Sequence, residues 1–268
     1  MGLPFATFLA ALAYAGAGGN LNLAQSLYAK EKGYGMGSYS GHITNILVGK
    51  KENLSLTGVT FEPTEENIGR FKTWWKKINI EHGLVFWLTG AFTMLLLSLL
   101  AYSTVNKAAG VETSINFVIF EAGVIAQKTF SFLGTFFLLI AALMLFGTQF
   151  SVFGSNARII SENLVIFSPN RFKVEKMHLY FYLSLILQIL AGIIIFASGF
   201  IEPLTLVVTG AVLNAFSMFI YTGLILWLNM SNLARELRPS PIRIFFVGSA
   251  FVFYGAFSLF TIFQRIFK

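Results

Sequence analysis

Charged residues are missing from six long stretches of this chain, and their absence limits the possible folds more than any other feature. Each stretch is long enough for a helix to cross a hydrocarbon core, which takes about 20 residues. Charged residues make up only 12% of the chain, whereas a soluble domain carries roughly 25%. A buried helix of a soluble protein keeps one polar face, which most of these stretches lack. They are residues 1–28, 83–106, 129–157, 179–201, 203–234 and 244–264.

The stretches predict an all-α integral membrane protein with about six transmembrane helices, in which residues 1–268 form a single transmembrane domain. A cleaved signal peptide is disfavoured for the first stretch, because no Lys or Arg precedes Lys30. We therefore expect a multi-pass protein of the cell (inner or plasma) membrane, with the lipid bilayer as a partner. The expected helices are residues 3–28, 83–105, 129–157, 179–201, 203–232 and 244–264.

The distribution of basic residues predicts the orientation of these helices. If the connections alternate between sides, fifteen Lys and Arg fall on one side and four on the other. The basic side is cytoplasmic by the positive-inside rule, which places both termini outside. A first helix that enters from outside with no charge to guide it suggests that Met1 is an internal start or a fragment boundary.

The longest cytoplasmic segment, residues 30–82, is expected to be a loop that contains a basic amphipathic helix at 64–79. Thr64 suits the N-cap of this helix, and two glutamates follow it. Such a helix with tryptophans favours the membrane interface, as an anchor or as a regulatory lipid sensor. On the other side, Glu121 is expected to be solvated, with a role at the outer mouth as the alternative.

The first expected span is interrupted by a polar, glycine-rich segment. Gly16, Gly18 and Gly19 fall within four residues, and Asn20, Asn22 and Gln25 follow. Each glycine disfavours a helix by about 1 kcal/mol relative to Ala. Unwound backbone at membrane depth is tolerated only against protein or water, and broken helices supply ion sites in secondary transporters. The segment therefore predicts half of a central ion site, with close helix packing through small residues as the alternative.

Two later spans carry polar stripes that could line a pathway. Residues 147–156 include Thr148, Gln149 and Ser151, and residues 203–232 place Asn214, Ser217 and Tyr221 on one helical face. An Asn in a long uncharged run costs free energy unless it is paired or wetted. Packing between helices is the alternative for both stripes.

The composition disfavours several other functions. The chain has no cysteine, so disulfides and thiolate metal sites are excluded. All twelve acidic residues are glutamate, and the three histidines form no spaced metal cluster. We expect no enzyme and no cofactor. We also expect no nucleic-acid partner, because basic cytoplasmic loops account for the net charge of +7. Glu81 and His82 either relay protons or mark the water boundary.

The run Gly-Gly-Asn-Leu-Asn-Leu-Ala-Gln-Ser at residues 18–26 resembles the sixth transmembrane helix of the Nramp family of divalent metal transporters. That helix carries a Met-Pro-His-Asn-Leu type motif in well-known members. Residues 146–151, Phe-Gly-Thr-Gln-Phe-Ser, resemble the eighth helix. The segments at 30–37, 74–76 and 81–82 resemble a divergent bacterial branch. The resemblance covers nearly the whole chain, as the C-terminal half of the family.

The resemblance implies the family's fold, two inverted five-helix repeats with helices one and six broken at the substrate site (an APC/LeuT-like fold). It implies import of a divalent metal ion as substrate, commonly coupled to protons. Gly18 and Gly19 would lie near the Met-Pro pair and Asn20 near the histidine. Asn214 would lie near the polar ligand of helix ten. Backbone carbonyls would come from Ala15, Gly16 or Ala17.

This sequence departs from the family in its ligands. The thioether is absent, and neutral oxygens suit harder ions such as Mn²⁺ or Mg²⁺. Helix one, with its Asp-Pro-Gly motif, is absent as well. We therefore expect a partial transporter that assembles with a separate N-terminal half or as a homo-oligomer. The alternatives are another substrate on the same fold and a non-transporting membrane subunit or scaffold.

Overall fold

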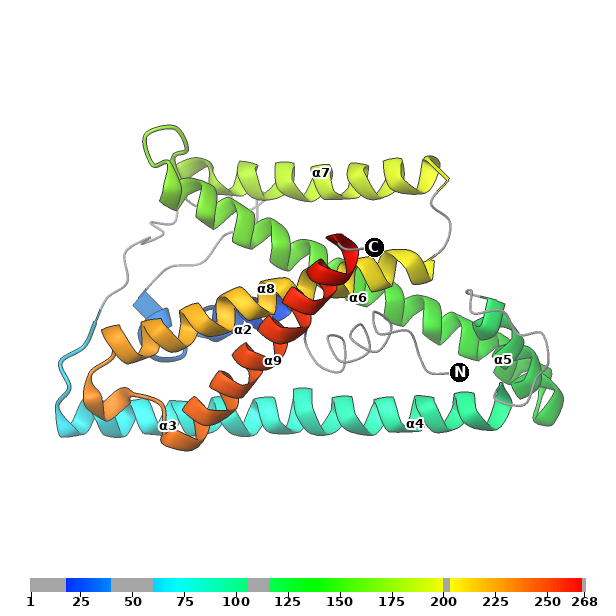
Figure 1. The fold of residues 1–268 in the computed structure, drawn as a ribbon, viewed down its shortest axis with the longest axis horizontal. Coiled ribbons are helices and arrows are strands. Elements are labelled where there is room, and N and C mark those ends of the chain that lie inside the picture. Colours follow the sequence, from blue (N-terminus) through cyan, green and yellow to red (C-terminus); the bar gives the residue numbers. More distant parts are fainter. Residues whose placement is uncertain (1–17, 40–59, 106–115, 200–202, 267–268) are drawn as a thin grey trace. The chain divides into compact units, whose positions relative to one another are not determined.

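The computed structural model describes residues 18–39, 60–105, 116–199 and 203–266. Within these residues the chain is helical and contains no strand (Figure 1). It divides into two compact units. Of the described residues, the first unit holds 18–39, 60–86 and 207–266, and the second holds 87–105, 116–199 and 203–206.

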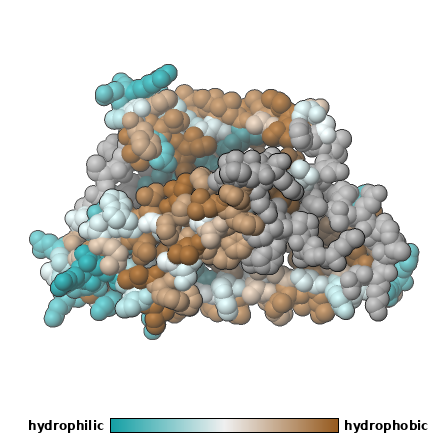
Figure 2. Space-filling view, in the orientation of Figure 1, coloured by the Kyte–Doolittle hydropathy of each residue, from teal (hydrophilic) through white to brown (hydrophobic). Residues whose placement is uncertain are grey.

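Five helices of the described residues are long and apolar enough to cross a membrane, as in a multi-pass membrane protein. Large hydrophobic side chains are exposed along them, which suits contact with lipid rather than water. Figure 2 shows hydrophobic side chains along α7 and hydrophilic ones at the N-terminal end of α3. The five are Glu65–Thr104, Ser131–Phe167, Val174–Ala197, Thr205–Asn232 and Pro241–Thr261.

From residue 207 onward the first unit contains two of the apolar helices, α8 (Pro203–Asn232) and α9 (Pro241–Ile266), joined through the short helix η5 (Arg235–Leu237). Glycines let the two helices approach each other. A Cβ on Gly223 would lie 2.7 Å from the Phe251 ring, and one on Gly255 would lie 2.7 Å from the Phe219 ring. The two rings stack with centroids 4.8 Å apart. Offset stacking of this kind adds about 0.5–1.5 kcal/mol to area burial.

Helix α3 (Glu65–Glu81) begins at the predicted cap, where the Thr64 side chain accepts a hydrogen bond from the Asn67 N–H at 3.3 Å. The helix does not end before the span. A π-helical segment, η3 (His82–Leu88), leads directly into α4 (Thr89–Thr104). The sequence predicted an interfacial helix at 64–79 and a separate span at 83–105. In the structure the backbone stays helical from Glu65 to Thr104.

The second unit contains α5 (Asn116–Lys128), α6 (Ser131–Phe167) and α7 (Met177–Ala197), with the 3₁₀ helix η4 (Val174–Lys176) before α7. Helices α5 and α6 form a tight hairpin, and α6 packs against α7 (Figure 1). Helix α6 continues past the predicted end at residue 157. Arg158 and Glu162 form an ion pair at 3.2 Å, and both are mostly buried. This pairing lets the charges stay on a packed helix.

Glu121 on α5 is buried, with 5% of its surface exposed, so the expectation of a solvated side chain was wrong. The Thr104 hydroxyl donates a hydrogen bond to its Oε1 at 3.3 Å. Burial raises the pKa of the Glu121 carboxyl above its ordinary value, and the Thr104 hydrogen bond opposes this only in part. The folded protein therefore stabilises the neutral carboxyl relative to the unfolded chain.

This burial makes the stability depend on pH. Because the pKa is higher in the folded state, the carboxyl stabilises the fold below the unfolded value of about 4.5. That contribution is lost as the pH rises through the folded pKa. We expect Glu121→Gln to melt at a higher temperature than wild type at pH 8, with the difference shrinking toward pH 4. Glu175→Gln, at an exposed acid, is the control. A Glu121→Gln effect of equal size at both pH values would contradict the prediction.

Candidate functional site

The polar, glycine-rich segment lies at the start of α2 (Asn20–Glu31). Gly19 precedes the helix with a φ of 57°, a left-handed conformation that glycine adopts without strain. Two long hydrogen bonds close the first turn, from the Leu21 N–H to the Gly18 carbonyl at 3.4 Å and from the Asn22 N–H to the Gly19 carbonyl at 3.3 Å. No side chain caps this end of the helix. The α2 backbone thus starts at the double glycine.

Gly19 lies directly against Asn214 of α8. A Cβ placed on Gly19 would sit 2.1 Å from Asn214 Oδ1 and 2.5 Å from its Cγ. Any residue larger than glycine would collide with the amide. The structure therefore brings together two candidate site residues that are far apart in the sequence.

A second contact joins the same two helices. The Asn22 amide donates a hydrogen bond from Nδ2 to the Tyr221 hydroxyl oxygen at 2.6 Å. Tyr221 is buried, with 9% of its surface exposed. This bond uses one proton of the amide, so the Asn22 Oδ1 and the Tyr221 hydroxyl proton keep further bonding capacity. We refer to Gly19, Asn22, Asn214 and Tyr221 as the α2–α8 polar cluster.

Among the described residues of the first unit, Ser217 and Gln25 form no hydrogen bond with this cluster. The Ser217 hydroxyl donates to the Leu213 carbonyl of its own helix at 3.1 Å, and Gln25 is half-buried on α2. On α6, in the second unit, Ser151 likewise donates to its own helix, at 3.0 Å, and the stripe is exposed. Thr148 and Gln149 belong to this exposed stripe. Gly18 is buried beside Gly19, while Ala15, Gly16, Ala17 and the Asn20 side chain lie outside what the structure describes.

A charged cluster that was not predicted from the sequence lies at the C-terminal end of α2. Glu81 Oε1 accepts hydrogen bonds from the Tyr28 hydroxyl and, at 2.5 Å, from Lys32 Nζ. Glu81 Oε2 accepts from the Tyr34 hydroxyl at 3.4 Å. The hydrogen bond with Glu81, followed by that with Tyr28, raises the pKa of Lys32 above its ordinary value. The ammonium therefore stays charged.

The Glu81 cluster ties α2 to α3. The ring of Tyr28 also faces His82, with centroids 6.2 Å apart. Tyr28 and Lys32 are four residues apart on one helical face, which is the single signal in the sequence that they act together. Glu81 and His82 stood out in the sequence as a proton relay or a water boundary. The contacts add a structural role, because Glu81 holds the end of α2 through Tyr28 and Lys32.

The two clusters differ in what they can bind. The α2–α8 polar cluster offers neutral amide and hydroxyl groups, which are ligands for hard cations and hydrogen-bonding partners for polar solutes. Among the described residues, no three His, Asp or Glu side chains gather into a metal site. The described groups of this cluster would therefore offer a divalent ion only neutral oxygen ligands.

No family model, no curated protein and no solved structure matches this chain. The class of the protein therefore rests on its own features. Among the described residues these are five helices fit to cross a membrane, and the start of α2 at Gly19 packed against Asn214 of α8.

Proposed function

We propose that this chain is part of a membrane transporter that moves a divalent cation, with the α2–α8 polar cluster contributing to the substrate site. The observation that carries the proposal is the contact between Gly19 and Asn214. A glycine-led helix start at an amide of a neighbouring helix suits such a site, because secondary transporters present helix ends and unwound carbonyls to substrate. The Nramp-like sequence run at residues 18–26 supports the same reading.

The chemistry of the cluster favours a hard ion such as Mn²⁺ or Mg²⁺. Neutral oxygens without a thioether or an acid give a site of low charge. In transport the remaining ligands would come from the backbone before Gly18 and from a separate N-terminal half or a second copy. The proposal includes coupling to protons, and the only support for this part is the sequence resemblance to the Nramp family.

The uncapped start of α2 favours one other substrate class. A helix N-terminus presents backbone N–H groups and a partial positive charge, which attract a carboxylate. An amino acid on the same fold is therefore the second candidate. The third, a non-transporting subunit, predicts that neither solute binds.

Binding to the purified chain in detergent tests the proposal directly. We expect the free Mn²⁺ signal in electron paramagnetic resonance to fall with a dissociation constant on the order of millimolar, as for sites of low charge. Mg²⁺ should compete. Asn214→Ala and Asn22→Ala should each weaken Mn²⁺ binding, because each removes an amide oxygen. Ser217→Ala should not, because that hydroxyl is bonded within α8.

Each contrary result has a distinct meaning. Mn²⁺ binding that is equal in all four proteins would place the ion elsewhere on the chain. Protection of the fold by amino acids but not by metal would favour the second candidate. If neither solute binds, and cells making the chain with a partner half show no uptake, the transport proposal is wrong.

A further inference from the structure

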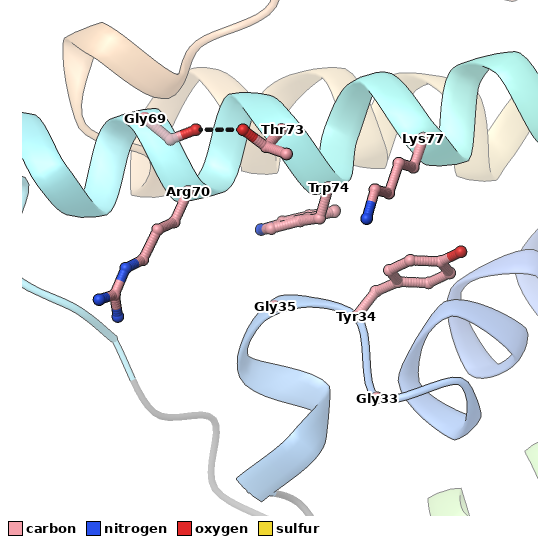
Figure 3. Close-up of a pocket in the computed structure, with 8 residues that line it drawn as sticks. All are labelled: Gly33, Tyr34, Gly35, Gly69, Arg70, Thr73, Trp74 and Lys77. Atoms are coloured by element: carbon pink, nitrogen blue, oxygen red, sulfur yellow. Dashed lines mark hydrogen bonds between the residues drawn. The ribbon is translucent and has the colours of Figure 1, made fainter.

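A pocket of about 460 Å³ lies between α3 and the turn that follows α2. Figure 3 shows Lys77 extending into the space between the Trp74 and Tyr34 rings, while Arg70 lies at the opposite end. Gly35 forms part of the floor. The pocket thus combines two basic side chains with two aromatic walls, all from the first unit.

Two glycines with positive φ shape the floor of the pocket. Gly33 has a φ of 69° and Gly35 a φ of 58°, so the chain turns sharply on either side of Tyr34. A Cβ on Gly35 would lie 2.9 Å from the Trp74 ring. The turn therefore rests directly on the indole, which keeps the walls in place.

The charge balance of the pocket is positive. Arg70 pairs with Glu66 at 2.6 Å, one turn away on an exposed part of α3. In the described part of the chain, no carboxylate forms an ion pair with Lys77. The nearby Glu81 is already bonded to Lys32 and two tyrosines. Among the described residues, no carboxylate would therefore compete with an entering anion for the Lys77 ammonium.

The pocket also lies close to the apolar part of its helix. Lys77 precedes the uncharged run that starts at Gly83 by six positions, which is roughly 9 Å along a helix. This distance is comparable to the headgroup layer, which adds roughly 5–8 Å on each side of the hydrocarbon core. The flexible side chain of Lys77 can extend over the remaining distance to the lipid phosphate. Aromatic side chains such as Trp74 favour the same depth.

From this combination we infer that the pocket binds the phosphate headgroup of an anionic membrane lipid. Lys77 contacts the phosphate, Arg70 adds positive charge at the other end of the pocket, and Trp74 and Tyr34 contact the glycerol and the first acyl carbons. By the positive-inside rule the pocket lies at the cytoplasmic leaflet, where anionic lipids attract basic side chains. This inference does not depend on the transport proposal, since it uses none of the α2–α8 polar cluster.

The test is native mass spectrometry of the full chain released from nanodiscs that mix phosphatidylglycerol with phosphatidylcholine. Wild type should retain phosphatidylglycerol in preference to phosphatidylcholine. Lys77→Gln should lower this retention about tenfold, the effect of losing one direct hydrogen bond between charged groups. Arg70→Gln should lower it less, because Glu66 already engages that side chain.

Matched controls separate a pocket from a merely basic helix. Lys76 and Lys72 are exposed on the same helix and do not line the pocket. Lys76→Gln and Lys72→Gln remove the same charge and should leave retention close to wild type. Lys77→Arg should preserve it. Gly69→Leu should lower it without any change of charge, because Gly69 lines the pocket and has open space above it.

Three results would overturn the inference. The first is equal loss with Lys76→Gln and Lys77→Gln, which would show diffuse attraction to the helix. The second is equal retention of the two lipids by wild type. The third is displacement of the lipid by inorganic phosphate, which would assign the pocket to a soluble anion. Melting temperatures of all variants show whether a loss reflects unfolding, and the wild-type comparison of lipids stands even if a variant fails to fold.

Discussion

Gly19→Ala is expected to destabilise the protein by about 2–5 kcal/mol and to disrupt the α2–α8 polar cluster. A left-handed backbone costs a non-glycine residue about 1–2 kcal/mol, and Gly19 has a φ of 57°. The new Cβ would also lie 2.1 Å from Asn214 Oδ1, an overpacking that costs typically 1–3 kcal/mol. Thermal unfolding in detergent, followed by tryptophan fluorescence, measures the combined effect.

The two causes can be separated with variants of the same chain. Gly199 has a φ of 89° but no atom within 4 Å of an added Cβ, so Gly199→Ala reports backbone strain alone. Asn214→Ala removes the two colliding atoms and should partly rescue Gly19→Ala. Suppose that Gly19→Ala lowers the melting temperature no more than Gly199→Ala does, and that Asn214→Ala gives no rescue. The close contact between Gly19 and Asn214 is then absent in the protein.

Gly134→Ala is expected to loosen the hairpin of α5 and α6 by about 1–3 kcal/mol. The added Cβ would lie 2.5 Å from the Ala122 carbonyl oxygen and 2.8 Å from the Ala126 Cβ. Neither neighbour can rotate away, since one is backbone and the other is a methyl group fixed to it. The helices must therefore separate, which should lower the melting temperature and shift the unfolding curve in SDS.

Gly147→Ala is the matched control on the same helix. Its Cβ would meet nothing within 4 Å, so the substitution should be neutral or stabilising by up to about 1 kcal/mol through helix propensity. Equal destabilisation by the two variants would mean that α6 tolerates no side chain at either glycine, and that the hairpin contact is not the cause.

The sequence predicted the membrane helices well where charge alone decides the outcome. Runs without charge have few alternatives to burial in lipid or protein, and five such helices are present in the described residues. The ends of helices were harder to predict. Arg158 looked like a boundary because an isolated charge belongs in water, but its pairing with Glu162 one turn later keeps α6 helical. Such a pair can be recognised only once both residues are known to be helical.

Contacts between segments that are far apart along the chain could not be predicted from the sequence. The double glycine and Asn214 each stood out as polar or flexible features within apolar runs, but no periodicity reveals that they touch. Asn22 and Tyr221 are 199 positions apart, and Lys32 and Glu81 are 49 apart. Glu121 was misjudged because its neighbours are semi-apolar, while its burial depends on a hydroxyl at Thr104 and on the packing around α5.

Helix α2 is fastened at both ends, which gives it a mechanical role. Its twelve residues span about 18 Å. Near its start Asn22 is bonded to Tyr221 of α8, and near its end Tyr28 and Lys32 are bonded to Glu81 of α3. A rod held in this way cannot slide without breaking a bond at one end. Tyr34, just beyond the helix, lines the basic pocket and also holds Glu81. Tyr34 and Glu81 therefore connect the pocket to the helix whose start lies against Asn214.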